Sequence, residues 1–363
     1  MRTTVVEDLC VLAGVWDETV RRSTVSPFLR YGWFDAWWRA FGGGGMPHVV
    51  AAWRGEELAG LLPLWRDPNG VLRSMTNQHS PEFMIVADDE AAERALWREA
   101  LRLHAPEIMV NVLDPARGVE NLCRASRHRL RPVSAATATV SPFVDTSGSF
   151  TEFQCSLGRN LRKDLDRRRR RLHECGDVDI RFSDGSCALD HTLDEAFRVE
   201  RTGWKGECGV AIEPGSTVER FYRDTAHWAS ALGILHVAEL RLNGKLIAFE
   251  YSMRVSGAHY AIRAAFDAQH RGLAPGKLLL LEAIRDAFES ECQTYDFLGG
   301  PDPYKFEWTS HARRLVRVRS FAPTPHGMSR YARSKLGGLR QRKNVTETET
   351  EQQLLPGQRV IHA

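Results

Sequence analysis

The clearest hydrophobic pattern in the chain lies between Ala261 and Trp308, where the period of apolar positions changes several times. The alternating run HYAIRAAFD predicts a strand, and LLLLEAIRDAFES has apolar residues at helical spacing. The loop HRGLAPGK stands between them, and the apolar run YDFLGG predicts a further strand that ends in glycines. A turn that opens a helix presents free N–H groups and the positive end of the helix dipole, so this stretch predicts a phosphate-binding turn.

The strands before this stretch form a continuous series. The run ILHVAELRLNGKLIAFEYSMRVSGAHYAIRAAFD predicts three consecutive strands, with Asn243-Gly244 as a hairpin turn and Ser256-Gly257 as the next turn. Two helices precede them, near LDEAFRVERTGWKG and STVERFYRDTAHWASALG, and DVDIRFSD predicts a strand before those helices. The second half is therefore expected to be a mixed α/β unit.

The first half has a similar order of elements. An aromatic helix, FLRYGWFDAWWRAF, ends at a run of glycines, and HVVAAWRGEELAGLLPLWRD then predicts a hairpin. Helix, strand, helix and an extended segment follow up to about residue 146. The hairpin run from His48 aligns without a gap on the run from His236, which favours a duplicated α/β unit, although the phosphate turn has no counterpart in the first half.

A basic segment stands between the halves, and we expect one helix from about Thr151 to Glu174, TEFQCSLGRNLRKDLDRRRRRLHE. Leucines at helical spacing provide an apolar stripe, and arginines from Arg159 to Arg171 cover the rest. Two interpretations remain open. The helix is either a bridge with a solvated charged face, or a contact for RNA phosphates, an anionic lipid surface or a nucleotide-linked substrate.

Composition narrows the possibilities further. A chain of 363 residues suits two domains, and a net charge of +3 indicates no partner by itself. The seven cysteines include no CxxC pair, which argues against structural zinc and a disulfide framework. We expect a cytoplasmic protein, because no apolar run approaches the ~18 residues of a membrane span and the N-terminus does not resemble a signal peptide. From about Ser329 the chain is polar, and we expect a flexible tail.

From Phe153 to Phe321 the chain resembles the GNAT-type acyltransferase domain of the CelD-like and FemAB-like group. The resemblance rests on the basic segment LRKDLDRRRRRL, the hairpin AELRLNGKLIAFEYS, the strand HYAIRAAFD, the turn LAPGKLLL and the closing YDFLGGPDPYKFEW. It implies an α/β fold of two tandem GNAT-like domains with mixed, mostly antiparallel sheets flanked by helices and joined by a basic helix. The expected domains are 1–148 (acceptor side, degenerate cofactor site), 149–325 (acyltransferase) and 326–363 (flexible polar tail).

The resemblance implies transfer of an acyl group from a thioester, usually acetyl-CoA or another acyl-CoA, to the amine of a small molecule or amino sugar, without a metal. The cofactor's pyrophosphate would lie on the turn, where the sequence departs from the glycine-dense form because Pro275 removes one donor. FemAB-like relatives instead take an aminoacyl group from tRNA, for a peptide or nucleoside acceptor. A third possibility is a non-catalytic scaffold in polysaccharide or envelope assembly. The residues expected to bind the cofactor are Arg271, Gly272, Ala274, Gly276 and Lys277.

On the family plan Glu250 is the general base, since acyl transfer to an amine requires removal of a proton and burial between Phe249 and Tyr251 would favour the uncharged carboxyl. The alternative is an exposed strand residue. Asp267 is a candidate catalytic residue that is expected either to orient the amine, to hold Arg263, or to cap the loop that follows. Arg263 itself is a candidate substrate-binding residue.

The glycine corner GGPDPYKFEW carries the remaining candidates. Tyr304 is expected to protonate the leaving thiolate, and Lys305 to bind a carboxylate or phosphate of the substrate. The alternative is a purely structural corner. Asp296 is either a substrate-binding residue or a core carboxylate with its hydrogen bonds satisfied. No GxSxG, HExxH or Walker-type motif is present.

Overall fold

The computed structural model describes residues 1–24, 26–115, 119–203, 206 and 208–336. The chain divides into two compact units, Met1–Val140 with Arg313–Ala363, and Ser141–Ala312. Each unit has a mixed sheet flanked by helices, which confirms the predicted α/β class with mostly antiparallel pairing.

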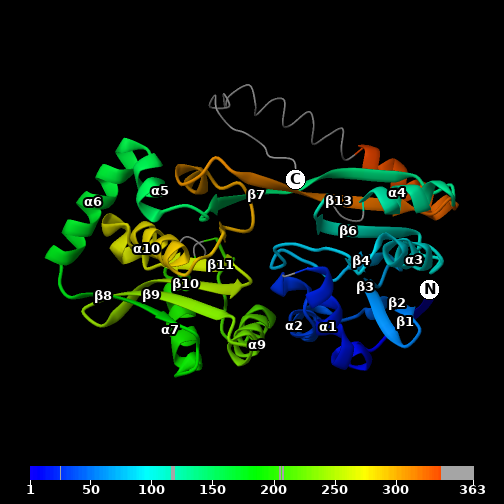
Figure 1. Cartoon of the computed structure of the whole chain (residues 1–363), viewed down its shortest axis with the longest axis horizontal. Coiled ribbons are helices and arrows are strands. Elements are labelled where there is room, and N and C mark those ends of the chain that lie inside the picture. The colour runs from blue at the N-terminus through cyan, green and yellow to red at the C-terminus, as the bar shows by residue number, and fades with distance from the viewer. Residues whose placement is uncertain (25, 116–118, 204–205, 207, 337–363) are drawn as a thin grey trace. The chain divides into compact units, whose positions relative to one another are not determined.

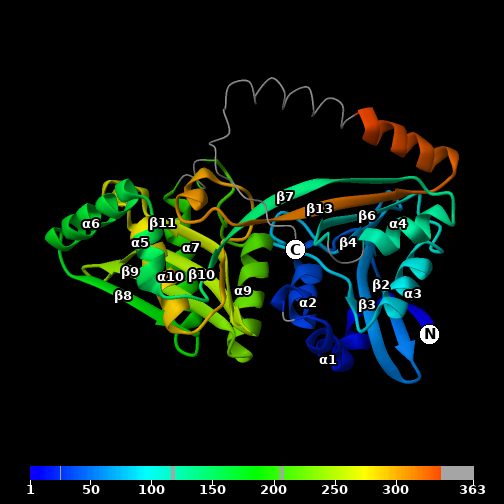
Figure 2. The same ribbon diagram turned by 45° about the horizontal axis from the view of Figure 1, so that its top comes forward.

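In the first unit the sheet has helices on both faces. Helices α1 (Ala13–Ser23) and α2 (Tyr31–Phe41) lie on one face, and α3 (Glu90–Ala100) and α4 (Val119–Arg127) on the other (Figure 2). Neighbouring strands pair antiparallel, except for β4 with β6. The strands in sheet order are β1 (Arg2–Val6), β2 (Met46–Arg54), β3 (Glu57–Arg66), β4 (Leu72–Ser74), β6 (Glu107–Leu113) and β13 (Ala312–Phe321), with β5 (Val86–Ala87) beside β3.

The aromatic helix α2 packs in the core of this unit, as its pattern predicts. Trp33, Phe34 and Trp37 are each about 1% exposed. The short 3-10 helices η1 (Leu9–Leu12) and η2 (Pro27–Leu29) add further buried side chains beside it.

In the second unit the sheet order is β7, β12, β11, β10, β9, β8. Pairing is antiparallel except between β11 and β12. Helices α5 (Phe150–Ser156), α6 (Arg159–Glu174) and α10 (Pro275–Glu289) lie over one face, and α7 (Leu189–Arg201) and α9 (Thr217–Ala231) over the other (Figure 1). The strands are β7 (Val133–Asp145), which starts in the first unit, β8 (Val178–Ser183), β9 (Leu235–Leu242), β10 (Lys245–Val255), β11 (Ala258–Phe266) and β12 (Thr294–Asp296).

The basic segment is two helices, which corrects the prediction of one helix over 151–174. Leu157 adopts an extended backbone (φ −61°, ψ 145°) and Gly158 is the N-cap of α6. Leu157 is 5% exposed, so the extended residue directs its side chain into the core and separates the helices. Leu165 and Leu172 enter the same core, and Arg169 pairs with Glu282 of α10 at 2.7 Å. The basic helix is therefore a layer of the second unit.

The two hairpins predicted to be duplicates have the same register. His48 is paired with Leu64 across β2 and β3, and His236 with Ser252 across β9 and β10, a separation of 16 residues in both. Both hairpins also have a register shift near the turn.

The last described segment, 325–336, is helical, and Arg330 pairs with Glu107 at 2.7 Å. This segment falls within the expected flexible tail, whose remaining residues, 337–363, lie outside the described residues. No helix in the described part of the chain is long and apolar enough to cross a membrane.

Candidate functional site

The second sheet opens where β11 and β12 separate. These strands pair only through three residues, from Ala258↔Thr294 to Tyr260↔Asp296. Beyond that point, 261–266 have β10 as their strand partner in the described part of the chain. The opening contains a cavity of ≈ 670 Å³. Its lining includes residues 261–266 of β11, Glu250, Tyr295, Tyr304 and Gly276.

Glu250 lies at this cavity with its carboxylate already oriented. It is 3% exposed, so the alternative of an exposed strand residue is wrong. His259 Nε2 lies 2.8 Å from Oε1, and the Tyr295 hydroxyl donates to Oε2. The rings of His259 and Tyr295 stack with centroids 4.7 Å apart. Two donors thus fix one carboxylate, which leaves its remaining lone pairs available to a substrate proton.

His259 is fully buried, and burial lowers its pKa despite the neighbouring Glu250. The ring is therefore neutral at pH 7 and must donate from Nε2 to reach the carboxylate as an acceptor. Its Nδ1 then accepts from Arg254 Nη2, 3.4 Å away. Sequence reasoning missed His259 because a single histidine in a strand has no characteristic spacing.

A second carboxylate contacts the polar cluster formed by Glu250, His259 and Arg254. Asp286, on α10, accepts from Arg254 and lies 3.0 Å from His236 Nε2. Burial opposes its ionisation, but His236 and Arg254 lower the pKa of Asp286 to about 2. Hydrogen-bonded and charged partners therefore connect α10 to the strand residues that hold Glu250.

The sequence does contain a signal for this group. Glu250, Ser252 and Arg254 alternate along β10 with the apolar Phe249, Tyr251 and Met253. Alternation is typical of a strand with one solvated face, yet Glu250 and Ser252 are buried and Arg254 reaches Asp286 of α10. A polar stripe beneath a covering helix indicates function when it is paired in this way.

Tyr304 lines the same cavity from the short helix η4 (Pro303–Glu307). It is 44% exposed, and its hydroxyl has no hydrogen-bond partner among the described residues. Burial of part of the ring, together with the negative charges of Asp302 and Glu250, raises the pKa of Tyr304 above its usual value. The phenol is therefore protonated at neutral pH and can donate.

Lys305 is 5% exposed and binds the glycine corner. Its ammonium lies 2.8 Å from the Leu298 carbonyl, 2.9 Å from the Gly300 carbonyl and 2.8 Å from Asp302. Three acceptors satisfy the three N–H groups of a lysine. Leu298 has φ +53°, so this clamp stabilises a strained corner, and a role of Lys305 in substrate binding stays a prediction.

Arg263 lines the cavity together with the carboxylate that neutralises it. Glu200, which is fully buried, accepts from Arg263 Nε at 2.7 Å and from Nη2 at 2.9 Å. The guanidinium also lies over the ring of Tyr222. Arg263 is therefore held by Glu200 and not by Asp267, and its contact with substrate stays a prediction.

Asp267 and Asp296 lie outside the cavity lining. Asp267 caps the 3-10 helix η3 (Ala268–Leu273) by accepting from Gln269 N, and lies 3.2 Å from Lys245 Nζ. Burial opposes its ionisation, but these contacts keep the pKa of Asp267 below its usual value. Of the alternatives for Asp267, capping is the one that the geometry supports. Asp296 is 1% exposed and accepts through Oδ1 from Leu298 N at 2.8 Å and from Ser141, so it is a core carboxylate, and a role in substrate binding stays a prediction.

The predicted phosphate turn connects η3 to α10. Ala274 has φ +51° and its carbonyl accepts from Lys277 N and Leu278 N, while Pro275 has no N–H. Gly276 lines the cavity, and its N–H donates to no turn carbonyl in the described part of the chain. Lys277 also lines it but pairs with Glu307 at 2.5 Å. Arg271, Gly272 and Ala274 belong to the turn without lining the cavity, and Arg168 of α6 donates to the Gly272 carbonyl.

Residues 159–306 match the family of the acetyltransferase (GNAT) domain. This segment of the second unit is similar to the GNAT domain. Solved structures extend the likeness over both units. The first is FemX, with a TM-score of 0.59 at 12% identity over 89% of this chain and 97% of that chain. A conserved protein of unknown function from Bacteroides thetaiotaomicron has a TM-score of 0.54 at 13% identity, over 88% of this chain and 100% of that chain.

A tandem GNAT protein from the clavulanic acid biosynthesis pathway has a TM-score of 0.51 at 12% identity, over 89% of this chain and 99% of that chain. No curated protein matches. The predicted tandem, FemAB-like GNAT fold is thereby confirmed.

No group of three or more potential metal ligands is present among the residues that the structure describes.

Proposed function

We propose that the second unit transfers an acyl group, acetyl by default, from coenzyme A to the amine of a small molecule or amino sugar. The observation that carries this proposal is the position of Glu250, which is buried, held by two donors and placed on the wall of the cavity where β11 and β12 separate. A base beside open strand backbone matches what attack on a thioester requires.

In the proposed reaction the amine nitrogen attacks the thioester carbonyl carbon. Backbone N–H groups along 261–266 would stabilise the oxyanion, and Glu250 would take the proton that the amine loses. The C–N bond forms as the C–S bond breaks. Tyr304 would give its proton to the leaving thiolate, so the products are the amide and free CoA-SH.

The wall of the cavity offers one candidate position for the pyrophosphate of the cofactor. Gly276 N–H, at the start of α10, is the helix-dipole donor on this wall, and it would meet the pyrophosphate. The turn supplies few other donors to a phosphate. Several of its N–H groups donate to carbonyls of the turn itself, and Pro275 has no N–H. Lys277 would have to exchange Glu307 for phosphate to contribute. The proposal therefore includes modest affinity for the nucleotide end of coenzyme A.

The test is calorimetry of the full chain with acetyl-CoA, longer acyl-CoAs and free CoA, with thermal shift as the second readout. A ligand that binds only the folded state raises the melting temperature by mass action. Binding that is lost in a variant with a larger side chain at Gly276 would support the proposal. No binding of any of the thioesters would remove it.

A second candidate is aminoacyl transfer from tRNA to a peptide or nucleoside acceptor. The likeness to FemX and the exposed arginines of α6 favour it. It would require RNA binding that weakens steeply with salt. A catalytically silent scaffold is the third candidate, and it would tolerate the loss of Glu250 without any change in its binding partner.

A further inference from the structure

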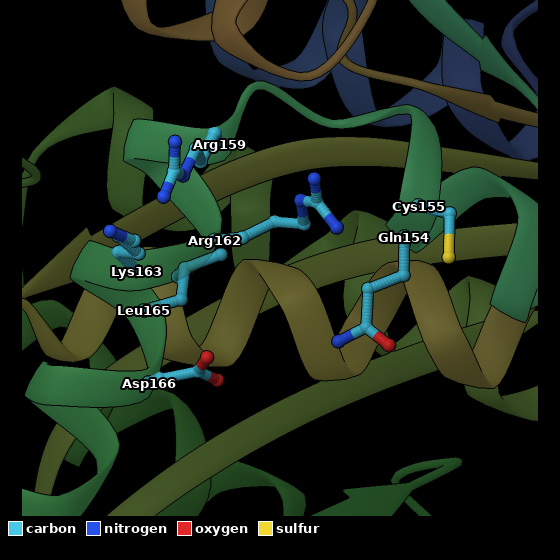
Figure 3. A pocket seen from close by; sticks show the side chains of 7 residues that line it. All are labelled: Gln154, Cys155, Arg159, Arg162, Lys163, Leu165 and Asp166. Atoms are coloured by element: carbon cyan, nitrogen blue, oxygen red, sulfur yellow. The ribbon is translucent and has the colours of Figure 1, made fainter.

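A second cavity lies in the same unit, between α5 and α6, away from the residues of the acyl cavity. Its volume is ≈ 460 Å³. Figure 3 shows Arg162 extending from α6 toward α5, where Gln154 and Cys155 lie. The lining residues are Gln154, Cys155, Arg159, Arg162, Lys163, Leu165 and Asp166.

The positive charge of this cavity is only partly compensated by the residues that line it. Arg159, Arg162 and Lys163 form no ion pair among the described residues, whereas Arg168 and Arg169 of the same helix pair with Asp164 and Glu282. Arg162 Nε is buried without a hydrogen-bond partner in the described part of the chain. Asp166 is the one carboxylate of the lining, and in Figure 3 it lies at the opposite end of the cavity from Cys155. Three cations against one carboxylate leave an excess of positive charge.

The position of these cations increases the imbalance. They occupy the first turns of α6, which has no acidic residue in its first turn and no side-chain cap at Gly158. Cations at the positive end of a helix dipole are unfavourable, because this end prefers negative charge. A bound anion would remove that penalty and would also give buried Arg162 Nε a partner.

We propose that this cavity binds a phosphate group of a small ligand, a phosphate monoester or a diphosphate. Its concave form and its volume fit a small molecule, and its lining has no aromatic ring on which a base could stack. These two features favour a small phosphate ester over RNA. The site is independent of the acyl-transfer proposal, since no lining residue is shared between the two cavities.

The probe is inorganic pyrophosphate, titrated by calorimetry into the full chain at fixed ionic strength. Arg162→Gln and Arg159→Gln should each weaken binding roughly tenfold, as expected for loss of a charge-assisted contact. The matched control is the double variant Arg170→Gln with Arg171→Gln, which removes exposed charge from the same helix outside the cavity, and it should stay within about twofold. Because Arg159 is exposed, Arg159→Gln keeps the test valid if the Arg162 variant folds poorly.

Absence of pyrophosphate binding at millimolar concentration would overturn the proposal, and so would an equal loss in the control variant. Binding of a single-stranded RNA that weakens as much in the control as in the cavity variants would identify an RNA surface instead. A comparison of CoA with 3′-dephospho-CoA separates two sources of the phosphate. If the cavity variants weaken the binding of CoA but not that of 3′-dephospho-CoA, the cavity receives the 3′-phosphate of the donor itself. If CoA and pyrophosphate bind together, the cavity serves a separate phosphate ester.

Discussion

The two units contain the same hairpin with different side chains on one face. The positions of Glu250 and Ser252 in β10 correspond, in the shared register, to Leu62 and Leu64 in β3, both fully buried. Arg254 corresponds to Arg66, which donates to His48 and to backbone carbonyls. The scaffold is therefore duplicated, while the buried carboxylate that could serve as a base is present in one copy.

The two units also differ in the charge at the start of the helix that follows the hairpin strands, α3 in the first unit and α10 in the second. In the first unit Asp89 is the N-cap of α3. Its carboxylate accepts from Ala92 N at 2.8 Å, and Glu90 and Glu93 add negative charge in the first turn. In the second unit α10 has no acidic residue in its first turn, and its second residue, Gly276, lies on the cavity wall. Only the second helix start is suited to an anion, so chemistry and cofactor would belong to one unit and leave the other for a different role.

The largest effect is expected from Glu250→Leu, which copies Leu62 into the second hairpin. Loss of the base should lower kcat/KM on the order of a hundredfold or more. The variant also leaves His259 and Tyr295 without their acceptor, so the free energy of unfolding should fall by about 1–3 kcal/mol. Glu250→Gln keeps an acceptor and should lose activity with little loss of stability. Glu239→Gln, a buried carboxylate outside the cavity, is the control. Normal turnover by Glu250→Gln would exclude the base role.

Tyr304→Phe should reduce kcat by roughly tenfold to a hundredfold. The melting temperature should hardly change, because the hydroxyl has no hydrogen-bond partner among the described residues to lose. The informative measurement uses thioester donors whose leaving thiols differ in pKa. If Tyr304 protonates the thiolate, the variant should recover most of its rate with the most acidic thiol. A loss that is equal for all donors would contradict this role.

The fold could be predicted from the sequence better than the site. Hairpin turns such as Asn243-Gly244 and the apolar periods of α10 are local signals, and local signals place elements reliably. The break between α5 and α6 was not predicted, because Leu157 is extended only to satisfy tertiary packing.

Within the site, Glu250 and Tyr304 could be predicted, and both line the cavity. His259 and Asp286 could not, because their importance comes from pairing across β10, β11 and α10, which no spacing in the sequence encodes. Lys305 is a residue for which the sequence suggests a role that the structure does not require. Its residue type suggests a ligand contact, whereas its protein acceptors are visible only in three dimensions.

His259 should make the stability of the second unit depend on pH. Burial lowers its pKa in the folded state, so the unfolded chain binds a proton at a higher pH than the folded chain does. The contribution of His259 to the free energy of unfolding is complete above its pKa in the unfolded chain, near ~6.5. It is lost as the pH falls toward the lower pKa of the folded chain, by up to about 1.4 kcal/mol per pH unit. Urea unfolding between pH 7.5 and 5 measures the slope. His259→Gln should flatten it, whereas exposed His173→Gln should not, and an unchanged slope in both would contradict the assignment.

A smaller effect is expected at the turn. A Cβ on Gly276 would lie 2.9 Å from the Phe266 ring, whereas a Cβ on Gly272 would meet nothing within 4 Å. Gly276→Ala should therefore raise the KM for acyl-CoA by roughly three- to tenfold with kcat little changed, as expected when binding common to ground and transition states is lost. Gly272→Ala is the matched control and should behave as the parent. Equal KM values for the two variants would remove Gly276 from the cofactor site.

The smallest expected effect is a difference in stability between variants at the starts of α3 and α10. Asp89→Ala removes the side-chain cap of α3 and should cost about 1 kcal/mol. At the start of α10, Ala274 adopts φ +51°, a conformation that glycine tolerates better, so Ala274→Gly should stabilise the protein by a fraction of that amount. Chemical denaturation of both variants measures the two changes. Opposite signs would mean that the first helix start is built for stability, whereas the second retains strain at the wall of the proposed cofactor cavity. A loss of stability in both variants would contradict strain at the start of α10. The two units would then differ only in the chemistry of their side chains.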